Sequence, residues 1–260
     1  MKKTALITGA SSGIGEAMSD VFARNGFDLV LTARHAEKLE SISKSLTEKY
    51  GITVFVIPTD LSKTEAPEDI FNQVREKGIE VEVLVNNAGF GDFGFFHESD
   101  WKKQEEQINL NIKSLTHMTH LFAQEMVKRK HGKILNVAST AAFQPGPLMS
   151  VYYATKAYVL FFTEGIANEL KDFGITVTAL CPGPTASGFQ IRAEMESSKL
   201  FKRKKVPSSM DVAEYGYDAL MKGKTVAVHG TMNYLKSLSP RFFPRNMVAK
   251  VVRKMQGASH

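Results

Sequence analysis

The sequence predicts an α/β fold, a doubly wound parallel sheet of about seven strands with helices on both faces. Three observations lead to this prediction. Short apolar segments rich in β-branched residues alternate along the chain with longer segments of helical spacing. A cluster of three glycines separates the first strand from the first helix, and polar residues follow the ends of five successive strands. The 260 residues, of which 43% are hydrophobic, suffice for a single large domain spanning 1–260.

Each strand is expected where a short apolar run ends at a turn or polar residue. The first, residues 4–8, precedes the glycine cluster, and the third, 53–57, ends before a proline. The fourth, 81–85, and the fifth, 133–137, run into asparagine and serine loops. Because alternating strands and helices form right-handed crossover units, these strands should lie parallel in one sheet. The other expected strands are 27–32, 176–180 and, as a seventh, 225–228.

Helices are expected between the strands, where apolar residues recur at helical spacing. Residues 36–50 place Leu39, Ile42 and Leu46 on one stripe, and 67–77 begins with a proline, which suits a first helical turn. The other expected helices are 16–24, 101–129 with a polar break near 109–111, and 152–173.

The glycine cluster is the first candidate binding site. Gly9, Gly13 and Gly15 lie between the expected strand 4–8 and the expected helix 16–24. Glycine permits a sharp turn and a close approach to a pyrophosphate, while a helix N-terminus offers free N–H groups. The turn therefore predicts a phosphate cradle, and an ordinary glycine loop is the alternative. The same turn also contains Ser11, Ser12 and Ile14.

The residue that ends the second strand bears on the choice of cofactor. In NAD-binding folds, a carboxylate about 20 residues beyond the glycine turn binds the ribose 2′-hydroxyl. This chain has Arg34 at that place, and a guanidinium can bind a 2′-phosphate. We therefore expect NADP(H) in preference to NAD(H). The alternative is that Arg34 is a solvated loop charge.

A candidate acid–base group lies on the expected helix 152–173. Tyr152 and Lys156 are four residues apart and share one helical face. A phenol has a pKa of about 10, and a nearby ammonium favours the phenolate and lowers that pKa. Ser139, just past a strand end, could donate a hydrogen bond to a substrate oxygen. A tyrosine and a lysine on a helix surface are the alternative interpretation.

Composition argues against several other classes. Cys181 is the only cysteine, which excludes a disulfide scaffold within the chain and a cysteine-based zinc cluster. His117 and His120 alone have a ligand-like spacing, and we expect no metal. No leader peptide and no membrane-spanning run are expected, so the expected location is cytoplasmic.

The net charge of +6 equals the number of basic residues in the stretch 231–260, which contains no Asp or Glu. Nucleic acid or an anionic membrane surface could bind such a stretch. We instead expect a solvated basic C-terminal extension, with no nucleic acid and with membrane contact as the less favoured role. Its apolar residues are expected to pack on a partner subunit or to cap a substrate pocket: Phe242, Phe243, Met247, Val248, Val251 and Val252.

These motifs resemble the short-chain dehydrogenase/reductase family, in its single-domain branch with a Rossmann-like fold. Residues 8–15 match its Thr-Gly-x-x-x-Gly-x-Gly turn, 86–89 its Asn-Asn-Ala-Gly motif, and 152–156 its Tyr-x-x-x-Lys motif. Ser139 and Asn111 stand where the family has its catalytic serine and asparagine. The resemblance runs from residue 4 to about residue 187.

The resemblance implies a reaction and a role for each residue. Hydride passes between the nicotinamide and a carbonyl carbon, while Tyr152 exchanges the proton of the oxygen and Ser139 holds that oxygen. Lys156 lowers the pKa of Tyr152 and binds the nicotinamide ribose, and Asn111 holds a water in a proton relay. Further cofactor contacts are implied for Asp60, Leu61, Asn87, Ala88, Gly89, Pro182, Gly183, Thr185 and Ser187, of which Ser187 has the usual spacing for the carboxamide hydroxyl. A homodimer or homotetramer is also implied, built by the helices 101–129 and 152–173.

The substrate is expected to be an apolar ketone, aldehyde or 3-oxoacyl compound. Residues 186–207 are expected to form a substrate lid, whose basic residues 202–205 could attract an anionic carrier. An NADP(H)-binding sensor with little turnover is the alternative, although the catalytic set is intact. A longer-branch epimerase or dehydratase would need an extra substrate domain. The loops expected near the nicotinamide supply Phe90, Phe93, Phe95, Phe96, Phe143, Leu148, Met149 and Phe189.

Overall fold

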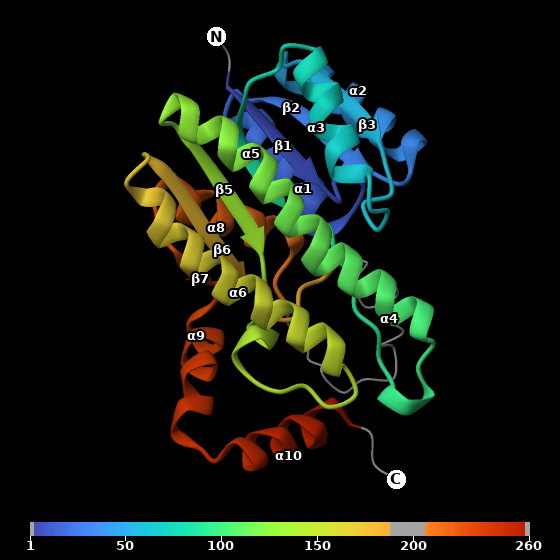
Figure 1. Cartoon of the computed structure of the whole chain (residues 1–260), viewed down its shortest axis with the longest axis vertical. Coiled ribbons are helices and arrows are strands. Elements are labelled where there is room, and N and C mark those ends of the chain that lie inside the picture. The colour runs from blue at the N-terminus through green and yellow to red at the C-terminus, as the bar shows by residue number, and fades with distance from the viewer. Residues whose placement is uncertain (1–2, 188–205, 258–260) are drawn as a thin grey trace.

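One parallel sheet forms the centre of the protein. The structure, a computed structural model, describes residues 3–187 and 206–257. Within these residues the strand order is β3-β2-β1-β4-β5-β6-β7, with every neighbouring pair parallel (Figure 1). The predicted doubly wound parallel sheet of seven strands is confirmed. The strands are β1 (Thr4–Thr8), β2 (Asp28–Ala33), β3 (Val54–Pro58), β4 (Val81–Asn86), β5 (Gly132–Val137), β6 (Ile175–Cys181) and β7 (Val226–Val228).

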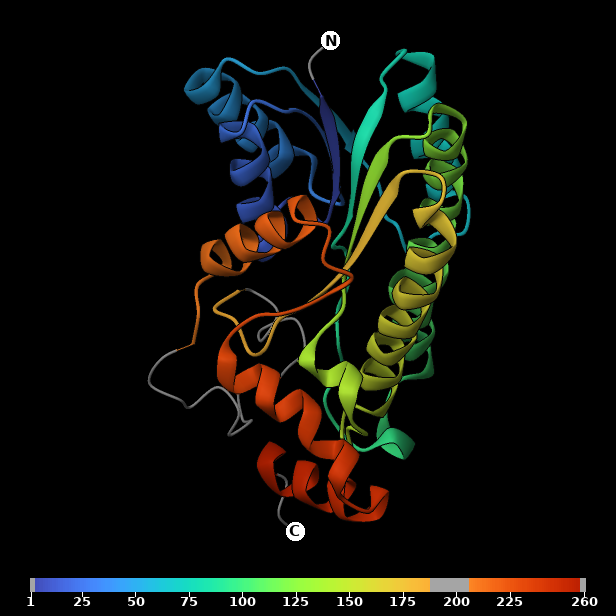
Figure 2. The same cartoon turned by 90° about the vertical axis from the view of Figure 1, so that its left-hand side faces the viewer.

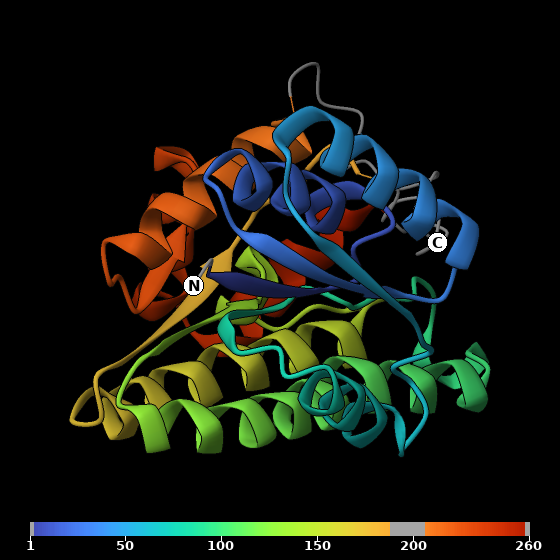
Figure 3. The ribbon, with the colours of Figure 1, turned by 90° about the horizontal axis from the view of Figure 1, so that it is seen from above.

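Helices cover both faces of this sheet. They include α1 (Gly13–Arg24), α2 (Ala36–Tyr50), α3 (Ala66–Glu76), α4 (Trp101–Ile108), α5 (Leu115–Arg129), α6 (Ser150–Lys171), α8 (Ser209–Met221), α9 (Thr231–Leu238) and α10 (Arg245–Gln256). α1, α2 and α8 pack on one face, and α3, α5 and α6 on the other (Figure 3). In β1, Ala5 and Ile7 contact the first layer and Leu6 the second, because successive side chains of a strand point to opposite faces. Burial on both faces explains why the strands are continuously apolar.

The long helix expected over 101–129 is interrupted where the sequence predicted a break. Residues Asn109–Ser114 form a π-helical segment, η2, between α4 and α5. Such a segment locally disturbs the regular hydrogen-bond ladder, and π-bulges are frequent at functional sites. This one carries Asn111, which is 1% exposed and therefore faces the interior.

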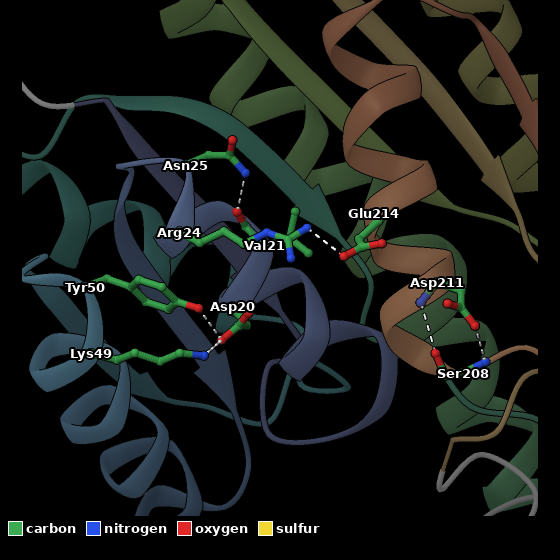
Figure 4. Close-up of polar contacts among 9 residues, drawn as sticks. All are labelled: Asp20, Val21, Arg24, Asn25, Lys49, Tyr50, Ser208, Asp211 and Glu214. Atoms are coloured by element: carbon green, nitrogen blue, oxygen red, sulfur yellow. Dashed lines mark hydrogen bonds and ion pairs between the residues drawn. The ribbon is translucent and has the colours of Figure 1, made fainter.

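Helix α8 is an element that the sequence reasoning missed. A capping box starts it: Ser208 Oγ accepts from the Asp211 N–H at 3.1 Å, and Asp211 Oδ2 accepts from the Ser208 N–H at 2.9 Å (Figure 4). Gly216 in its middle lowers helix propensity and obscures the pattern. An added Cβ on this glycine would lie 2.7 Å from the end of the side chains of both Leu180 and Met18, so the glycine leaves room for these two residues.

Polar contacts join α1 to its neighbours on the same face. Arg24 forms an ion pair of 2.8 Å with Glu214 of α8. Asp20 accepts hydrogen bonds of 3.0 Å from both Lys49 Nζ and the Tyr50 hydroxyl of α2 (Figure 4). These contacts hold α1, whose first turn contains Gly13 and Gly15, between α2 and α8.

The basic C-terminal extension folds as two helices. α9 and α10 are joined by a 3₁₀ turn, η5 (Ser239–Phe242), and lie at the end of the molecule opposite the N-terminus (Figures 1 and 2). Val248 and Val252 of α10 pack against Met149, Tyr152 and Tyr153. The extension therefore covers the candidate acid–base tyrosine from outside the sheet. Among the described residues, no helix combines the length and the apolar character needed to cross a bilayer.

Candidate active site

A cavity of about 490 Å³ collects most of the predicted site residues. It extends from Arg34 and Asp60, past the glycine turn, to Ser139 and Tyr152. It lies at the carboxyl ends of the strands where the strand order reverses beside β1, the place where open α/β sheets bind ligands. The predicted residues that line it are Gly9, Ser11, Ser12, Gly13, Ile14, Arg34, Asp60, Leu61, Asn87, Ala88, Gly89, Ser139, Tyr152, Lys156, Pro182, Gly183, Thr185 and Ser187.

Two of the predicted residues, Gly15 and Asn111, lie behind this lining rather than in it. A Cβ at Gly15 would overlap the carbonyl oxygen of Gly9 and lie 2.5 Å from Asn87 Nδ2. Gly15 is thus required for the close packing of α1 against the turn. Gly9 and Gly13 have φ values of +65° and +58°, the left-handed region that glycine adopts without strain.

The turn is clamped to the end of β4 by one threonine and one asparagine. Asn87 Nδ2 donates to the carbonyl oxygens of Thr8 at 2.9 Å and of Gly9 at 3.3 Å. Thr8 Oγ1 accepts from the N–H groups of Asn87 and Ala88, each at 2.9 Å, and donates to the Val85 carbonyl oxygen at 3.3 Å. Asn87 therefore positions the turn, besides lining the cavity. Sequence reasoning missed this role of Thr8, although Thr8 precedes Gly9 in the motif it identified.

This region fits a bound dinucleotide. Ser12 caps α1 without a side-chain hydrogen bond, which leaves the first N–H groups of α1 available to an anion at the cavity wall. Gly13 has no side chain to cover its backbone at the cavity wall. A Cβ at this position would lie 3.0 Å from the Cβ of Ser187. The exposed Arg34 and the half-buried Asp60 line the same end of the cavity. Hydrogen bonds from the Ser62 N–H and hydroxyl, together with the charge of Arg34, lower the pKa of Asp60 against the opposing effect of burial.

The acid–base candidates meet at the other end of the cavity. Lys156 Nζ donates to the Val137 carbonyl oxygen at 2.7 Å and lies 5.9 Å from the centroid of the Tyr152 ring. The Ser139 side chain hydrogen-bonds the Tyr152 phenol, and Ser139 Oγ also accepts from the Ala141 N–H at 3.1 Å. The spacing of four residues predicted this juxtaposition of Tyr152 and Lys156 correctly.

The electrostatics of this pair differ from expectation. Burial raises the pKa of Tyr152, and the hydrogen bond with Ser139 only partly offsets that rise. Burial also lowers the pKa of Lys156 to about 8. Burial disfavours the charged forms of both side chains, and it outweighs the lowering of the Tyr152 pKa that the sequence led us to expect from Lys156. Tyr152 therefore holds its proton at neutral pH, the form that a general acid needs.

Asn111 reaches the site through a loop. Its Nδ2 donates to the Phe90 carbonyl oxygen at 2.9 Å and to Thr155 Oγ1 at 3.1 Å, while Oδ1 accepts from the Phe90 N–H at 3.2 Å. An added Cβ on Gly89 would lie 3.0 Å from Asn111 Oδ1 and 3.5 Å from Lys156 Nζ. Asn111 thus holds the loop after β4 beside Lys156. Its implied water relay stays a prediction.

The substrate end of the cavity is only partly what the loops predicted. Phe90 and Met149 line it, whereas Leu148 is buried and Phe96 is 62% exposed. Phe93 and Phe143 pack into buried clusters, and Phe95 stacks under the guanidinium of Arg253 at 5.5 Å. Tyr153, which the sequence offered as the alternative ring but which lies only three residues before Lys156, also lines the cavity. Sequence reasoning missed several residues of the C-terminal helices, because long-range packing alone places them: Asn233, Lys236, Ser237 and Met255.

Hydrogen bonds join the two ends of the segment that was expected to form the lid. The Ala186 N–H donates to the Pro207 carbonyl oxygen at 2.9 Å, and Ser209 Oγ donates to the Ala186 carbonyl oxygen at 2.9 Å. Both ends of the segment 186–207 therefore lie together beside Thr185 and Ser187. The lid prediction itself, with Phe189 and the basic residues 202–205, concerns residues outside the described ranges.

Metal ligands are not grouped in the part of the chain that the structure describes, where no three His, Cys, Asp or Glu side chains could hold an ion. The two histidines of ligand-like spacing have separate contacts. His117 Nε2 lies 3.6 Å from Glu68, and His120 Nε2 lies 3.1 Å from the Gln124 amide nitrogen.

Most of the chain is similar to a known protein family. The family model described as "short chain dehydrogenase" matches residues 3–197. A very-long-chain 3-oxoacyl-CoA reductase of Anas platyrhynchos is 37% identical over 185 residues, covering 68% of this chain and 58% of that protein. A 17-beta-hydroxysteroid dehydrogenase type 3 of Mus musculus is 37% identical over 186 residues, covering 70% and 60%. The match thus spans about three fifths of these relatives.

A solved structure resembles the chain over nearly its full length. The short-chain dehydrogenase from Sphingobium yanoikuyae in complex with NADPH has a TM-score of 0.83 and 29% sequence identity. The similarity covers 99% of this chain and 98% of that one. It therefore includes the C-terminal stretch beyond the residues that the family model matches.

The packing at Gly15 generates a stability and binding prediction. We expect Gly15→Ala to lower the free energy of unfolding by about 1–3 kcal/mol, since the Cβ forces the turn away from α1. NADPH binding should weaken at least about tenfold, because the turn that carries the N–H groups shifts. Urea unfolding and fluorescence titration with NADPH measure the two effects.

Gly165→Ala is the matched control. Gly165 lies in α6, and an added Cβ there meets no atom within 4 Å. Its unfolding free energy should rise by up to about 1 kcal/mol through helix propensity, with NADPH binding unchanged. Equal behaviour of the two variants would contradict the packing argument.

Proposed function

Because the chain belongs to the short chain dehydrogenase family, we propose that it is an NADP(H)-dependent oxidoreductase acting on the carbonyl or alcohol carbon of a bulky apolar substrate. The observation that carries this proposal is the grouping of the buried Tyr152 and Lys156 with the half-buried Ser139 at the inner end of the cavity. When bound, the nicotinamide supplies or accepts the hydride. The residues of the chain supply the proton and hold the substrate oxygen.

Each side chain has a role that follows from its surroundings. In reduction, Tyr152 gives its phenolic proton to the carbonyl oxygen, and its raised pKa keeps that proton in place beforehand. Ser139, already hydrogen-bonded to the phenol, is placed to donate to the same oxygen. The Lys156 ammonium stabilises the phenolate that remains after the transfer. Asn111 holds the neighbouring loop in place through both of its amide atoms.

The preference for NADP(H) is supported by Arg34. This exposed guanidinium follows β2 and lines the cavity end opposite Tyr152, where the second strand of an NAD enzyme would place a carboxylate. A guanidinium binds a phosphate with two parallel hydrogen bonds. The resemblance to a dehydrogenase solved with NADPH agrees with this assignment.

A large apolar substrate is supported by the cavity lining and by the relatives. Phe90, Met149 and Met255 supply apolar surface near Tyr152, and the relatives named above act, by their names, on very-long-chain 3-oxoacyl-CoA and on hydroxysteroids. Large apolar ketones, aldehydes and 3-oxoacyl compounds are therefore the proposed substrates. A sensor that binds NADP(H) with little turnover remains the second candidate, and the assay below separates the two.

Self-association is proposed through α4 and α6. Trp101, Tyr158 and Phe161 are 63%, 38% and 68% exposed on these helices. Exposed large apolar side chains on helices indicate a protein contact. A second copy of the chain, forming a homodimer or homotetramer, is the proposed occupant.

Tyr152→Phe tests the proposed chemistry. NADPH oxidation is followed with ketones, aldehydes and 3-oxoacyl thioesters of increasing chain length. The variant should lose at least about 100-fold in kcat, since it keeps the ring but cannot transfer a proton. Tyr153→Phe, which only removes an acceptor for Gln256 Nε2, should retain turnover. Turnover kept by Tyr152→Phe contradicts the mechanism, and tight NADPH binding without turnover by the wild type favours the sensor.

The lowered pKa of Lys156 predicts a pH dependence of reduction. Below about pH 8 the lysine is charged and stabilises the Tyr152 phenolate, and above it this charge is lost. We therefore expect kcat/KM for reduction to fall as pH rises through about 8. Lys156→Met should be slower and lack this step. A step of unchanged position in the variant would assign the titration to another group.

Arg34→Ala tests the cofactor preference. Loss of a charged phosphate contact should raise the KM for NADPH about 10- to 100-fold while leaving the KM for NADH unchanged. Lys44→Ala is the control, because Lys44 is a 79% exposed cation of α2 outside the cavity lining. Equal changes for both cofactors in Arg34→Ala would show that the side chain does not read the 2′-phosphate.

A further inference from the structure

The two C-terminal helices expose an apolar surface on their outer side. Met232 and Leu235 of α9 are 62% and 56% exposed, Phe242 of η5 is 80% exposed, and Met247 and Val251 of α10 are 49% and 48% exposed. We call these five side chains the C-terminal surface. The elements that carry them, α9, η5 and α10, lie at the end of the molecule opposite the N-terminus (Figures 1 and 2). Large apolar patches of this kind mark interaction sites.

Packing fixes the orientation of this surface. In α10, Val248, Val252 and Gln256 form a buried stripe at intervals of four residues. Met247 and Val251 form the next stripe, about 100° round the helix. Ser237 is the corresponding buried residue of α9. Because the inner stripes already pack against the site, the outer stripes cannot turn inward.

Basic side chains accompany the apolar ones. Arg241, Arg245, Lys250 and Lys254 are exposed around the C-terminal surface. On the α10 helical wheel, Lys250 and Lys254 lie beside the Met247–Val251 stripe, on the side away from the buried stripe. The stretch 231–260 contains no Asp or Glu that could neutralise them.

We propose that the C-terminal surface docks on an anionic phospholipid bilayer. Exposed apolar and aromatic side chains enter the headgroup region, and flanking lysines and arginines contact anionic headgroups. A second copy is a poor occupant, since a two-fold contact places the same basic side chains opposite each other. This assignment changes the preference drawn from the sequence: Val248 and Val252 are buried in one cluster with Tyr152 and Tyr153, whereas Phe242, Met247 and Val251 are exposed.

The same helices link this surface to the cavity. Asn233 and Ser237 of α9 and Met255 of α10 line the cavity, while the neighbouring residues of both helices form the C-terminal surface. Docking would therefore bring the cavity to the boundary of the bilayer. This last consequence rests on the proposed function, but the docking itself requires no turnover.

Vesicle co-sedimentation of the full chain tests the proposal. The probes are vesicles of phosphatidylcholine alone and of phosphatidylcholine mixed with phosphatidylserine. The wild type should bind the mixed vesicles more tightly, and high salt should weaken that binding. Phe242→Asp, and Lys250→Glu combined with Lys254→Glu, should each weaken it at least about tenfold.

Two control variants, with the same kinds of substitution outside the C-terminal surface, test whether vesicle binding depends on where the residue lies. Phe173→Asp replaces a 46% exposed ring that follows α6 at the amino edge of the sheet. Lys44→Glu combined with Lys222→Glu reverses two exposed charges on α2 and after α8. Both controls should bind vesicles like the wild type, and circular dichroism should confirm that every variant is folded.

Three results would overturn the proposal. They are failure of the wild type to bind mixed vesicles, equal binding to neutral and mixed vesicles, and equal loss in test and control variants. Sedimentation velocity separates the rival occupant: if Phe242→Asp dissociates an oligomer without altering vesicle binding, the surface belongs to a second copy. Because no assay here uses NADPH, a negative outcome leaves the proposed oxidoreductase activity standing.

Discussion

The clamp between β1 and β4 is the contact on which the site depends. Thr8 Oγ1 and the Asn87 amide tie the last residue of one strand to the loop after its neighbour. Strands β1 to β3 form one half of the sheet and strands β4 to β7 the other. This contact therefore joins the two halves at the point where the strand order reverses. The glycine turn, the N-terminus of α1 and the loop carrying Gly89 take their positions from it. The cavity exists because these segments are held open at one edge of a rigid sheet.

Burial determines the protonation of Tyr152 and Lys156. Tyr152 and Lys156 are 9% and 5% exposed, so the charged form of each is disfavoured. The phenol of Tyr152 stays protonated at neutral pH, while the lowered pKa of Lys156, about 8, lies close to neutral pH. Part of this burial comes from α10, because Val248 and Val252 pack on the two tyrosines. The C-terminal helices therefore influence the chemistry although they carry no motif, and their outer faces remain available for another contact.

Local patterns in the sequence determined much of the molecule. The strands are short, continuous apolar runs, so burial on both faces of the sheet followed directly from their composition. The break in the long helix was visible because Asn109 and Asn111 interrupt an apolar stripe. Tyr152 and Lys156 meet because four residues make about one helical turn. In each case the interacting groups are close along the chain, and elementary geometry is enough to place them.

Only the tertiary structure decided the rest, because the determining contacts join distant residues. α8 was hidden by Gly216, which lowers helix propensity and packs closely against Leu180 and Met18, two residues distant in the chain. The direction of the Tyr152 pKa shift follows from burial by elements that lie before and after it in the chain. Likewise, the basic composition of 231–260 was plain from the sequence, but which apolar side chains face the cavity and which face outward depends on how α9 and α10 pack. Burial is a property of the assembled layers, and no local pattern specifies it.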